Sequence, residues 1–287
     1  MKTINPTKMI VNTHWSYKVN AVTLCRNLPI WKIAIMKIFV ISLERSVLRR
    51  KLIQKRLSEL GLEFEIVDAV DGRNLTESEV ILATRPLSYA IERGEIGCSL
   101  SHLSVYARMI AGDVRSALIL EDDAIPSQDL PGILKHLERE SVDEPVATIL
   151  TPPGQYFAHA DQQLSTTYSI HRLVEGTGAY GYVVNLAAAE KLIRFLYPVW
   201  MVSDRWQLIK ENAVCEIRCV VPPVITHPPY DDGELCKIST IHSGKDLGDV
   251  KREIWRKIKK KRRLSVKFRR AMWLLFTRNL TKIEKCS

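Results

Sequence analysis

Long apolar runs, clustered cysteines and a recognisable export signal are missing from this sequence. No stretch approaches the roughly 18 uncharged apolar residues that a membrane-spanning helix needs, and the first residues lack the charged, apolar and small-residue order of a secretory signal. The six cysteines lie far apart, and the close pair Cys215 and Cys219 has no Cys/His partners at zinc-finger spacing. We therefore expect reduced thiols and a cytoplasmic protein.

An excess of basic over acidic residues is also missing from most of the chain. The chain has 287 residues, 46% of them hydrophobic, which is enough for one large domain or two small ones, and we expect one main domain. The net charge is +10, yet twelve Lys and Arg and a single Glu lie in residues 251–270, so the rest is close to neutral. The basicity therefore belongs to the C-terminal tail.

Hydrophobic periodicity predicts where the fold begins. Residues 1–35 show no clear period and are expected to form a weakly ordered extension. Residues 36–42 form a β-branched run typical of a buried strand, 44–60 have the spacing of an amphipathic helix, and 62–67 alternate as a second strand. This strand–helix–strand order predicts an α/β fold with a mostly parallel central sheet flanked by helices.

Similar patterns continue along the chain and set the predicted domain limits. The catalytic domain is expected over 36–245, followed by a basic tail over 246–287. The sequence predicts helices at 96–110, 133–140 and 185–196, and strands at 117–120, 147–150 and 176–184.

Three adjacent carboxylates, Glu121, Asp122 and Asp123, follow the apolar run 117–120. Their mutual repulsion is tolerable at the end of a buried strand only if a cation or strong donors offset it. Oxygen ligands suit Mg²⁺ or Mn²⁺, and a nucleotide diphosphate can complete the coordination shell. Ligands of open α/β sheets gather at the carboxyl ends of the strands, where these residues are expected. A solvated acidic turn is the alternative, and the triplet alone is a weak signal.

Several blocks in a fixed order give the triplet a context. The sequence resembles glycosyltransferase family 25, the lipo-oligosaccharide galactosyltransferases of Gram-negative bacteria, from about residue 36 to 230. The blocks that carry the resemblance are MKIFVISLERS at 36–46, GEIGCSLSH at 94–102, LILEDD at 118–123, GTGAYGYVVNLAAAEK at 176–191 and PVWMVSD at 198–204. The resemblance implies a GT-A-like fold, a UDP-sugar donor, UDP-galactose in many members, Mn²⁺, and a lipid-linked oligosaccharide acceptor.

The metal ligands that this resemblance implies leave alternatives open. Asp122 and Asp123 match the family's carboxylates, whereas alternation along an extended strand would place Glu121 and Asp123 on one side. Asp123 belongs to both versions and is the first choice. His227 is a candidate third ligand from a C-terminal loop, and a merely exposed histidine is the alternative.

Other residues are candidates for binding the donor and for catalysis. Ser42 ends the first strand, and Arg45 and Arg49 follow it where a parallel sheet would present a nucleotide diphosphate; solvated helix bases are the alternative reading of the two arginines. His102 is either a core histidine or a site residue, and the resemblance favours the site.

Asp204 is the candidate general base of an inverting transfer, in which a carboxylate removes the proton of the acceptor hydroxyl. It could instead cap the helix expected from Arg205. The other candidate bases are Asp231, Asp232 and Glu234.

The tail combines Lys and Arg with aromatic and aliphatic residues, Trp255 and the run Trp273 to Phe276 among them. This profile is typical of an interfacial anchor for an anionic membrane, whereas nucleic-acid binding would leave the acidic triplet unexplained, and no nucleic acid is expected. We expect a metal-dependent inverting transferase that moves a hexose, galactose first, from a UDP-sugar to a lipo-oligosaccharide core acceptor. It would work on the inner face of the cytoplasmic membrane of a Gram-negative bacterium. A membrane- or nucleic-acid-binding scaffold with a degenerate transferase domain is the alternative.

Overall fold

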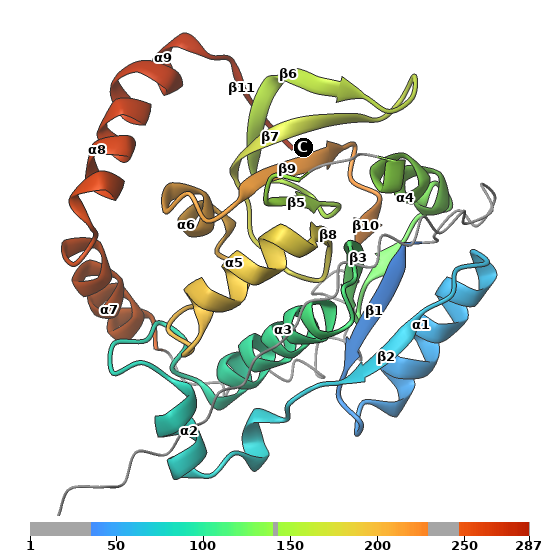
Figure 1. The fold of residues 1–287 in the computed structure, drawn as a ribbon, viewed down its shortest axis with the longest axis horizontal. Helices are drawn as coiled ribbons and strands as arrows, with labels where there is room; N and C mark the ends of the chain where they lie inside the picture. The colour runs from blue at the N-terminus through green and yellow to red at the C-terminus, as the bar shows by residue number, and fades with distance from the viewer. Residues whose placement is uncertain (1–35, 140–142, 229–246, 287) are drawn as a thin grey trace, which may run out of the picture. The chain divides into compact units, whose positions relative to one another are not determined.

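One large mixed sheet organises the chain (Figure 1). The computed structural model describes residues 36–139, 143–228 and 247–286, which belong to one compact unit. The strand order is β11-β6-β7-β9-β5-β8-β3-β1-β2. The strands of the sheet are β1 Lys37–Ser42, β2 Glu65–Asp68, β3 Ser116–Glu121, β5 Val146–Ile149, β6 Gln155–Gln163, β7 Ser169–Glu175, β8 Gly181–Asn185, β9 Glu216–Val221 and β11 Ile283–Lys285.

The sheet is parallel where the acidic triplet lies. Strand β1 pairs in parallel with β2 on one side and with β3 on the other, and β5 pairs in parallel with β9. Strand β8 runs antiparallel between β3 and β5. The expected α/β fold, a large central sheet flanked by helices, is confirmed. A short pair of strands, β4 Ile125–Pro126 and β10 Ile225–Thr226, joins the loops beyond β3 and β9.

Helices cover both faces of this sheet. They are α1 Val47–Glu59, α2 Glu77–Ala83, α3 Arg93–Ala111, α4 Leu130–Arg139, α5 Leu186–Leu196, α6 Trp206–Glu211, α7 Gly248–Lys260, α8 Leu264–Met272 and α9 Arg278–Leu280, with a single-turn 3₁₀ helix at Gly72–Asn74 and a π-helical segment at Trp273–Thr277.

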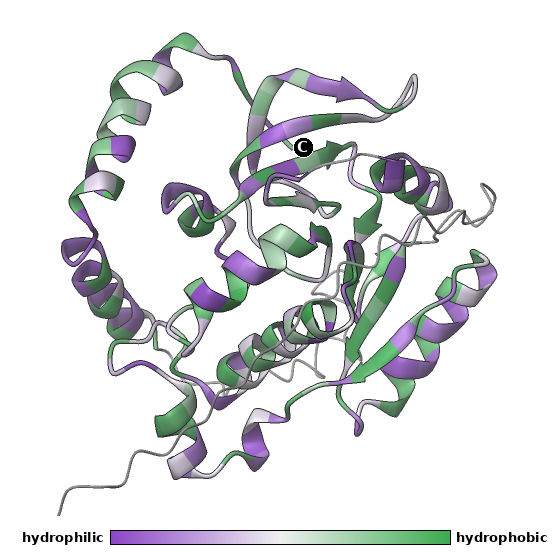
Figure 2. Cartoon of the chain, viewed as in Figure 1, coloured by the Kyte–Doolittle hydropathy of each residue, from purple (hydrophilic) through white to green (hydrophobic). Residues whose placement is uncertain are grey.

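Alternation along the strands divides the core into two layers. Phe39 and Ile119 point to the side covered by α3, α5 and α6, whereas Val40 and Leu120 point to the side covered by α1 and α4. All four side chains are almost fully buried, and the strands are correspondingly apolar in Figure 2. A parallel strand with helices on both faces is expected to be apolar throughout, which explains the run before the acidic triplet.

The strand predicted at 176–184 is shorter than expected. Strand β8 begins only at Gly181, because Gly178 has a φ of +87°, a left-handed backbone that does not continue a strand. Residues 176–180 instead form a loop at the end of the sheet where β3 delivers the acidic triplet, and the amide of Glu121 donates to the carbonyl of Tyr180 over 3.2 Å.

Two helices of the basic tail, α7 and α8, differ in how they pack. Trp255 of α7 packs edge-on against Tyr89, with 5.7 Å between ring centroids, and Ile258 is buried against the core. Helix α7 is otherwise strongly hydrophilic (Figure 2). In α8, Val266 is buried, whereas Leu264 and Phe268 are exposed.

Some expectations concern residues outside the described ranges. These are the extension 1–35, Cys25, Cys236 and the alternative bases Asp231, Asp232 and Glu234. Of the described cysteines, Cys98, Cys215, Cys219 and Cys286 are free thiols. The described helices include none that is both long and apolar enough to cross a membrane.

Candidate active site

A cavity of about 680 Å³ opens at the carboxyl ends of β1 and β3. Its walls come from the ends of these strands, the start of α1, the first turns of α3, the loop before β8, the segment before α6, and α7. Eight of the nine site residues expected from the sequence line it: Ser42, Arg45, Arg49, Glu121, Asp122, Asp123, Asp204 and His227. The ninth, His102, lies directly behind Glu121.

Arg49 joins two of the three adjacent carboxylates. Its Nη2 lies 2.5 Å from Oδ1 of Asp122 and 2.8 Å from Oδ2 of Asp123. The hydroxyl of Ser42, at the end of β1, donates to Oδ2 of Asp122 over 2.8 Å. Arg49 therefore holds Asp122 and Asp123 together, and Ser42 adds a donor to Asp122.

Asp123 offers the atom best suited to an additional ligand. Burial, then the charge of Glu121, raises the pKa of Asp123 to about 6, although Arg49 opposes the rise. Burial likewise raises the pKa of Asp122. Oδ1 of Asp123 is buried and has no hydrogen-bond partner. An unpartnered buried carboxylate oxygen next to two further carboxylates is a donor set that fits Mg²⁺ or Mn²⁺.

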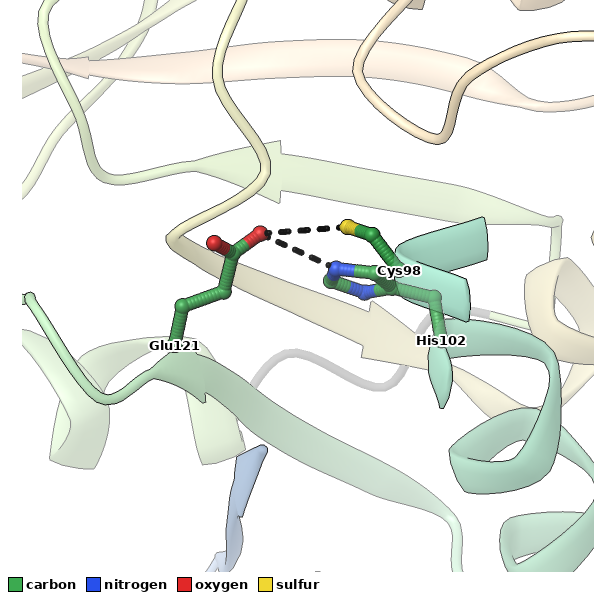
Figure 3. Close-up of side chains that lie close together, drawn as sticks. All are labelled: Cys98, His102 and Glu121. Atoms are coloured by element: carbon green, nitrogen blue, oxygen red, sulfur yellow. Dashed lines mark hydrogen bonds and ion pairs between the residues drawn. The ribbon is translucent and has the colours of Figure 1, made fainter. Parts of the chain in front are cut away.

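Glu121 turns away from the other two carboxylates, toward α3. Its Oε1 lies 3.2 Å from Nε2 of His102 and 4.0 Å from Sγ of Cys98, as Figure 3 shows. Glu121 ends β3 and shares the face of Ile119, and a backbone turn from the carbonyl of Glu121 to the amide of Ala124 follows at once. The alternation that would pair Glu121 with Asp123 therefore stops at Glu121.

The close approach of α3 to the loop after β2 depends on two glycines. A Cβ atom at Gly97 would lie 2.5 Å from the carbonyl oxygen of Val70, and one at Gly72 would overlap the backbone of Arg93. Ser101 adds a hydrogen bond, since its hydroxyl accepts from the amide of Val70 over 2.9 Å. Part of the 94–102 block therefore serves packing and not chemistry.

This loop presents Asp71 to Arg45, which lies 2.5 Å from it. The guanidinium holds the pKa of Asp71 far below its usual range. Arg45 thus lies at the cavity wall with its charge partly matched.

Asp204 and His227 lie on opposite segments of the cavity wall. Oδ2 of Asp204 accepts the amide hydrogen of Gly178 over 3.2 Å. Arg205 occupies the position that precedes α6, and its side chain makes no capping hydrogen bond to the helix. Asp204 therefore does not cap that helix. His227 packs edge-on against Tyr180 at 5.1 Å between ring centroids. The general-base role of Asp204 and the metal role of His227 stay predictions.

The sequence interpretation missed Lys251, which reaches the cavity from α7. Its ammonium pairs with buried Glu95 and lies 5.4 Å from the centroid of the Tyr89 ring. Glu95 in turn accepts from the amides of Ile91 and Glu92 and caps α3. Lys251 and Glu95 are 156 residues apart, so no local pattern could reveal the pair.

A family model and relatives of known name match this chain. The family model described as glycosyltransferase family 25 (LPS biosynthesis protein) matches residues 35–206. Procollagen galactosyltransferase 1 of Danio rerio is 29% identical over 175 residues, which are 57% of this chain and 29% of the relative. Procollagen galactosyltransferase 2 of Homo sapiens is 29% identical over 182 residues, which are 56% of this chain and 28% of the relative.

A relative named inactive also matches. The inactive glycosyltransferase 25 family member 3 of Homo sapiens is 28% identical over 173 residues, covering 56% of this chain and 29% of the relative. The chain therefore spans less than a third of the length of each of these relatives. A solved glycosyltransferase involved in glycosylation of the major capsid of PBCV-1 shares 8% identity with a TM-score of 0.33, covering 76% of this chain and 98% of that one.

These relatives correct one expectation. The prediction of a location on the inner membrane face of a Gram-negative bacterium is wrong, because the relatives named above come from zebrafish and human, and others come from cattle, mouse and fly. They point to a eukaryotic origin. The bacterial expectation came from the family resemblance, and the family also has the eukaryotic members named here.

Proposed function

Because this chain belongs to glycosyltransferase family 25, we propose that it is a metal-dependent, inverting galactosyltransferase that uses UDP-galactose. The observation that carries the proposal is the pair Asp122 and Asp123, held together by Arg49, with an unpartnered carboxylate oxygen at the wall of a large cavity. The galactosyltransferase names of two relatives support galactose as the sugar. The acceptor is proposed as a hydroxyl group of a glycan, and a lipid-linked one stays a prediction.

Asp123, Asp122 and Glu121 would hold Mn²⁺ or Mg²⁺, with His227 as a further candidate. The metal, when bound, would offset negative charge on the diphosphate leaving group. Arg49 would lose part of its contact with the carboxylates and become available to a phosphate oxygen, to which a guanidinium binds through two parallel hydrogen bonds.

Asp204 is proposed as the group that takes the proton from the acceptor hydroxyl. Asp204 lines the cavity and its Oδ2 accepts the amide hydrogen of Gly178, so Oδ1 would be the oxygen that takes the proton. Inversion follows if the hydroxyl attacks the anomeric carbon from the face opposite the diphosphate.

A donor panel tests the proposal. The purified chain is incubated with UDP-galactose, UDP-glucose, UDP-N-acetylglucosamine and GDP-mannose, with Mn²⁺ and a mixture of glycan acceptors, and products are read by mass spectrometry. We expect transfer from UDP-galactose that EDTA abolishes and added Mn²⁺ restores. Transfer that EDTA does not change would contradict the metal role. UDP binding without transfer from any donor would favour the alternative, a scaffold with a degenerate transferase domain. One relative is named inactive, so this alternative is a specific competitor.

We also propose that the exposed part of the tail binds an anionic membrane surface. Its apolar side chains form the C-terminal face: Leu264, Phe268, Leu275, Phe276 and Leu280, of which Leu264 and Leu280 are 81% and 82% exposed. No Asp or Glu occurs between Ile254 and Ile283, whereas Lys and Arg recur throughout this stretch. Arg262 and Arg270 pair with Glu211, while the remaining bases of this stretch outnumber its acidic partners. Exposed apolar residues among an excess of bases match a bilayer interface with anionic headgroups, where each base contributes about 1 kcal/mol.

Vesicle sedimentation tests this surface in the full chain. We expect binding to vesicles of phosphatidylcholine with phosphatidylserine, weaker binding to pure phosphatidylcholine, and loss of binding in the double variant Phe268→Gln and Leu275→Gln. Leu82→Gln is the matched control, because Leu82 is equally apolar and 76% exposed on α2. Unchanged binding in the double variant, or preference for duplex DNA over the vesicles, would contradict the proposal.

A further inference from the structure

A chain of buried hydrogen bonds runs from the core to the acidic triplet. The hydroxyls of Tyr106 and Tyr182 lie 2.7 Å apart, the Tyr182 hydroxyl lies 2.9 Å from Nδ1 of His102, and Nε2 of His102 lies 3.2 Å from Oε1 of Glu121. Tyr106, Tyr182 and His102 are each at most 1% exposed. Water therefore does not compete for the bonds among these three side chains.

The number of available hydrogens determines the direction of donation along this series of hydrogen bonds. Burial raises the pKa of both phenols, so each keeps its hydrogen. The Tyr106 hydroxyl has Tyr182 as its hydrogen-bond partner, and its hydrogen is satisfied only if Tyr106 donates to Tyr182. Tyr182 then donates to Nδ1 of His102, which places the histidine hydrogen on Nε2, from where it is donated to Glu121. The opposite direction would leave the Tyr106 hydrogen without an acceptor among the residues that the structure describes.

We propose that His102 is a positioning residue: Tyr182 holds the ring through Nδ1, and the hydrogen on Nε2 is donated to Glu121 and orients it in the active site. Both ring nitrogens are engaged, so His102 has neither a free lone pair nor a free proton with which to act on a substrate. The inference rests on the proposed transferase function, since Glu121 matters only if the adjacent cavity binds a metal and donor.

The orientation of Glu121 is the consequence of this arrangement. Its Oε1 receives Nε2–H of His102 and faces the thiol of Cys98, which burial keeps neutral by raising its pKa. Oε2 points away from both (Figure 3). Two donors from successive turns of α3 thus fix which oxygen Glu121 presents to the cavity, much as groups behind a metal ligand fix its direction.

Two tyrosine-to-phenylalanine substitutions in this series of hydrogen bonds test the inference. Tyr182→Phe removes the donor to Nδ1 and should release the tautomer, whereas Tyr106→Phe removes a hydroxyl of the same chain and leaves the Tyr182 bond to His102 intact. Nitrogen-15 NMR of the histidine-labelled full chain, with His102 identified by its absence in His102→Gln, reports the tautomer. We expect Nε2–H in the wild type and in Tyr106→Phe, and a mixture of tautomers in Tyr182→Phe.

Activity should follow the tautomer. We expect kcat to fall by roughly tenfold in Tyr182→Phe with little change in KM for the donor, and to stay near the wild-type value in Tyr106→Phe. Should Tyr182→Phe fail to fold because the Tyr106 hydroxyl loses its acceptor, the double variant Tyr106→Phe and Tyr182→Phe removes that unsatisfied group and takes its place.

Three results would decide the matter. Equal losses of kcat in Tyr106→Phe and Tyr182→Phe, with the tautomer unchanged, would overturn the inference, because packing alone would then explain both. A His102 that is Nδ1–H in the wild type would overturn it as well. A wild type that transfers no sugar would refute the proposed function, while a tautomer change confined to variants of Tyr182 would still support the arrangement of His102.

Discussion

The acidic cavity and the C-terminal face hold their charges in opposite ways. In the cavity Asp122 is nearly buried, and it contacts both Arg49 and Ser42. On the C-terminal face the bases lie near exposed apolar side chains, and no acidic residue occurs in the sequence from Ile254 to Ile283. Buried charge requires a partner within the chain, whereas exposed charge is solvated and available to an outside partner. The cavity therefore resembles a site prepared for a cation, and the face resembles one prepared for an anionic surface.

Removing one carboxylate from the cavity should have the largest effect. Asp123→Asn keeps the side-chain size but removes the charge whose oxygen lacks a partner, so we expect kcat to fall roughly 100- to 1,000-fold. Transfer assays at saturating UDP-galactose and Mn²⁺ measure this. Asp129→Asn, outside the cavity and bonded to Tyr168, is the control. A Asp123→Asn enzyme within threefold of the wild type would remove the metal role from this residue.

Removing the internal cation should have the next largest effect. Arg49→Gln leaves Asp122 and Asp123 together without the cation that contacts both, so we expect about 3 kcal/mol of destabilisation in metal-free buffer. Urea unfolding measures it, and Mn²⁺ should restore more stability to Arg49→Gln than to the wild type, because metal and arginine offset the same charges.

Lys55→Gln on the same helix is the control, since its pair with Glu59 is exposed and an exposed pair contributes less than about 1 kcal/mol. Equal effects of Mn²⁺ on the wild type and on Arg49→Gln would show that metal and Arg49 do not share the carboxylates.

Substitutions in the two parts of the tail should have the smallest effects on stability, and these effects should differ clearly. Trp255→Ser removes a ring that packs on Tyr89, and we expect about 2 kcal/mol of destabilisation from the lost packing. Leu275→Ser, at a side chain that is 65% exposed, should change stability by less than about 0.5 kcal/mol. Urea unfolding of both variants measures the difference. Comparable losses would mean that the C-terminal face is part of the folded core and is not free for a membrane.

The sequence interpretation succeeded where a single periodicity dominates. The strand expected at 36–42, the helix at 44–60 and the strand at 117–120 correspond to β1, α1 and β3 within a few residues. It did not identify β6 and β7, because β6 carries polar and exposed side chains along most of its length and has a shifted register. Apolar alternation is the signal of a strand, and β6 lacks it.

The sequence predicted which residues lie near the candidate site better than it predicted their contacts. Its blocks placed the candidate residues near one end of the sheet, because carboxyl ends of parallel strands gather there. Which residues touch was not predictable: Lys251 pairs with Glu95 across 156 positions, and His102 lies behind Glu121 instead of in the cavity. The roles of these residues in catalysis stay predictions.

The sequence by itself determined that an apolar strand would deliver three carboxylates to the edge of an α/β sheet, because buried strands must be apolar and repelling charges at their ends need partners. It also determined that the basicity would be confined to the tail. Only the tertiary structure decided that Arg49 joins Asp122 to Asp123, that Glu121 turns to His102, and that the tail divides into a docked helix and an exposed face. Those outcomes depend on contacts between distant segments, which local patterns do not encode.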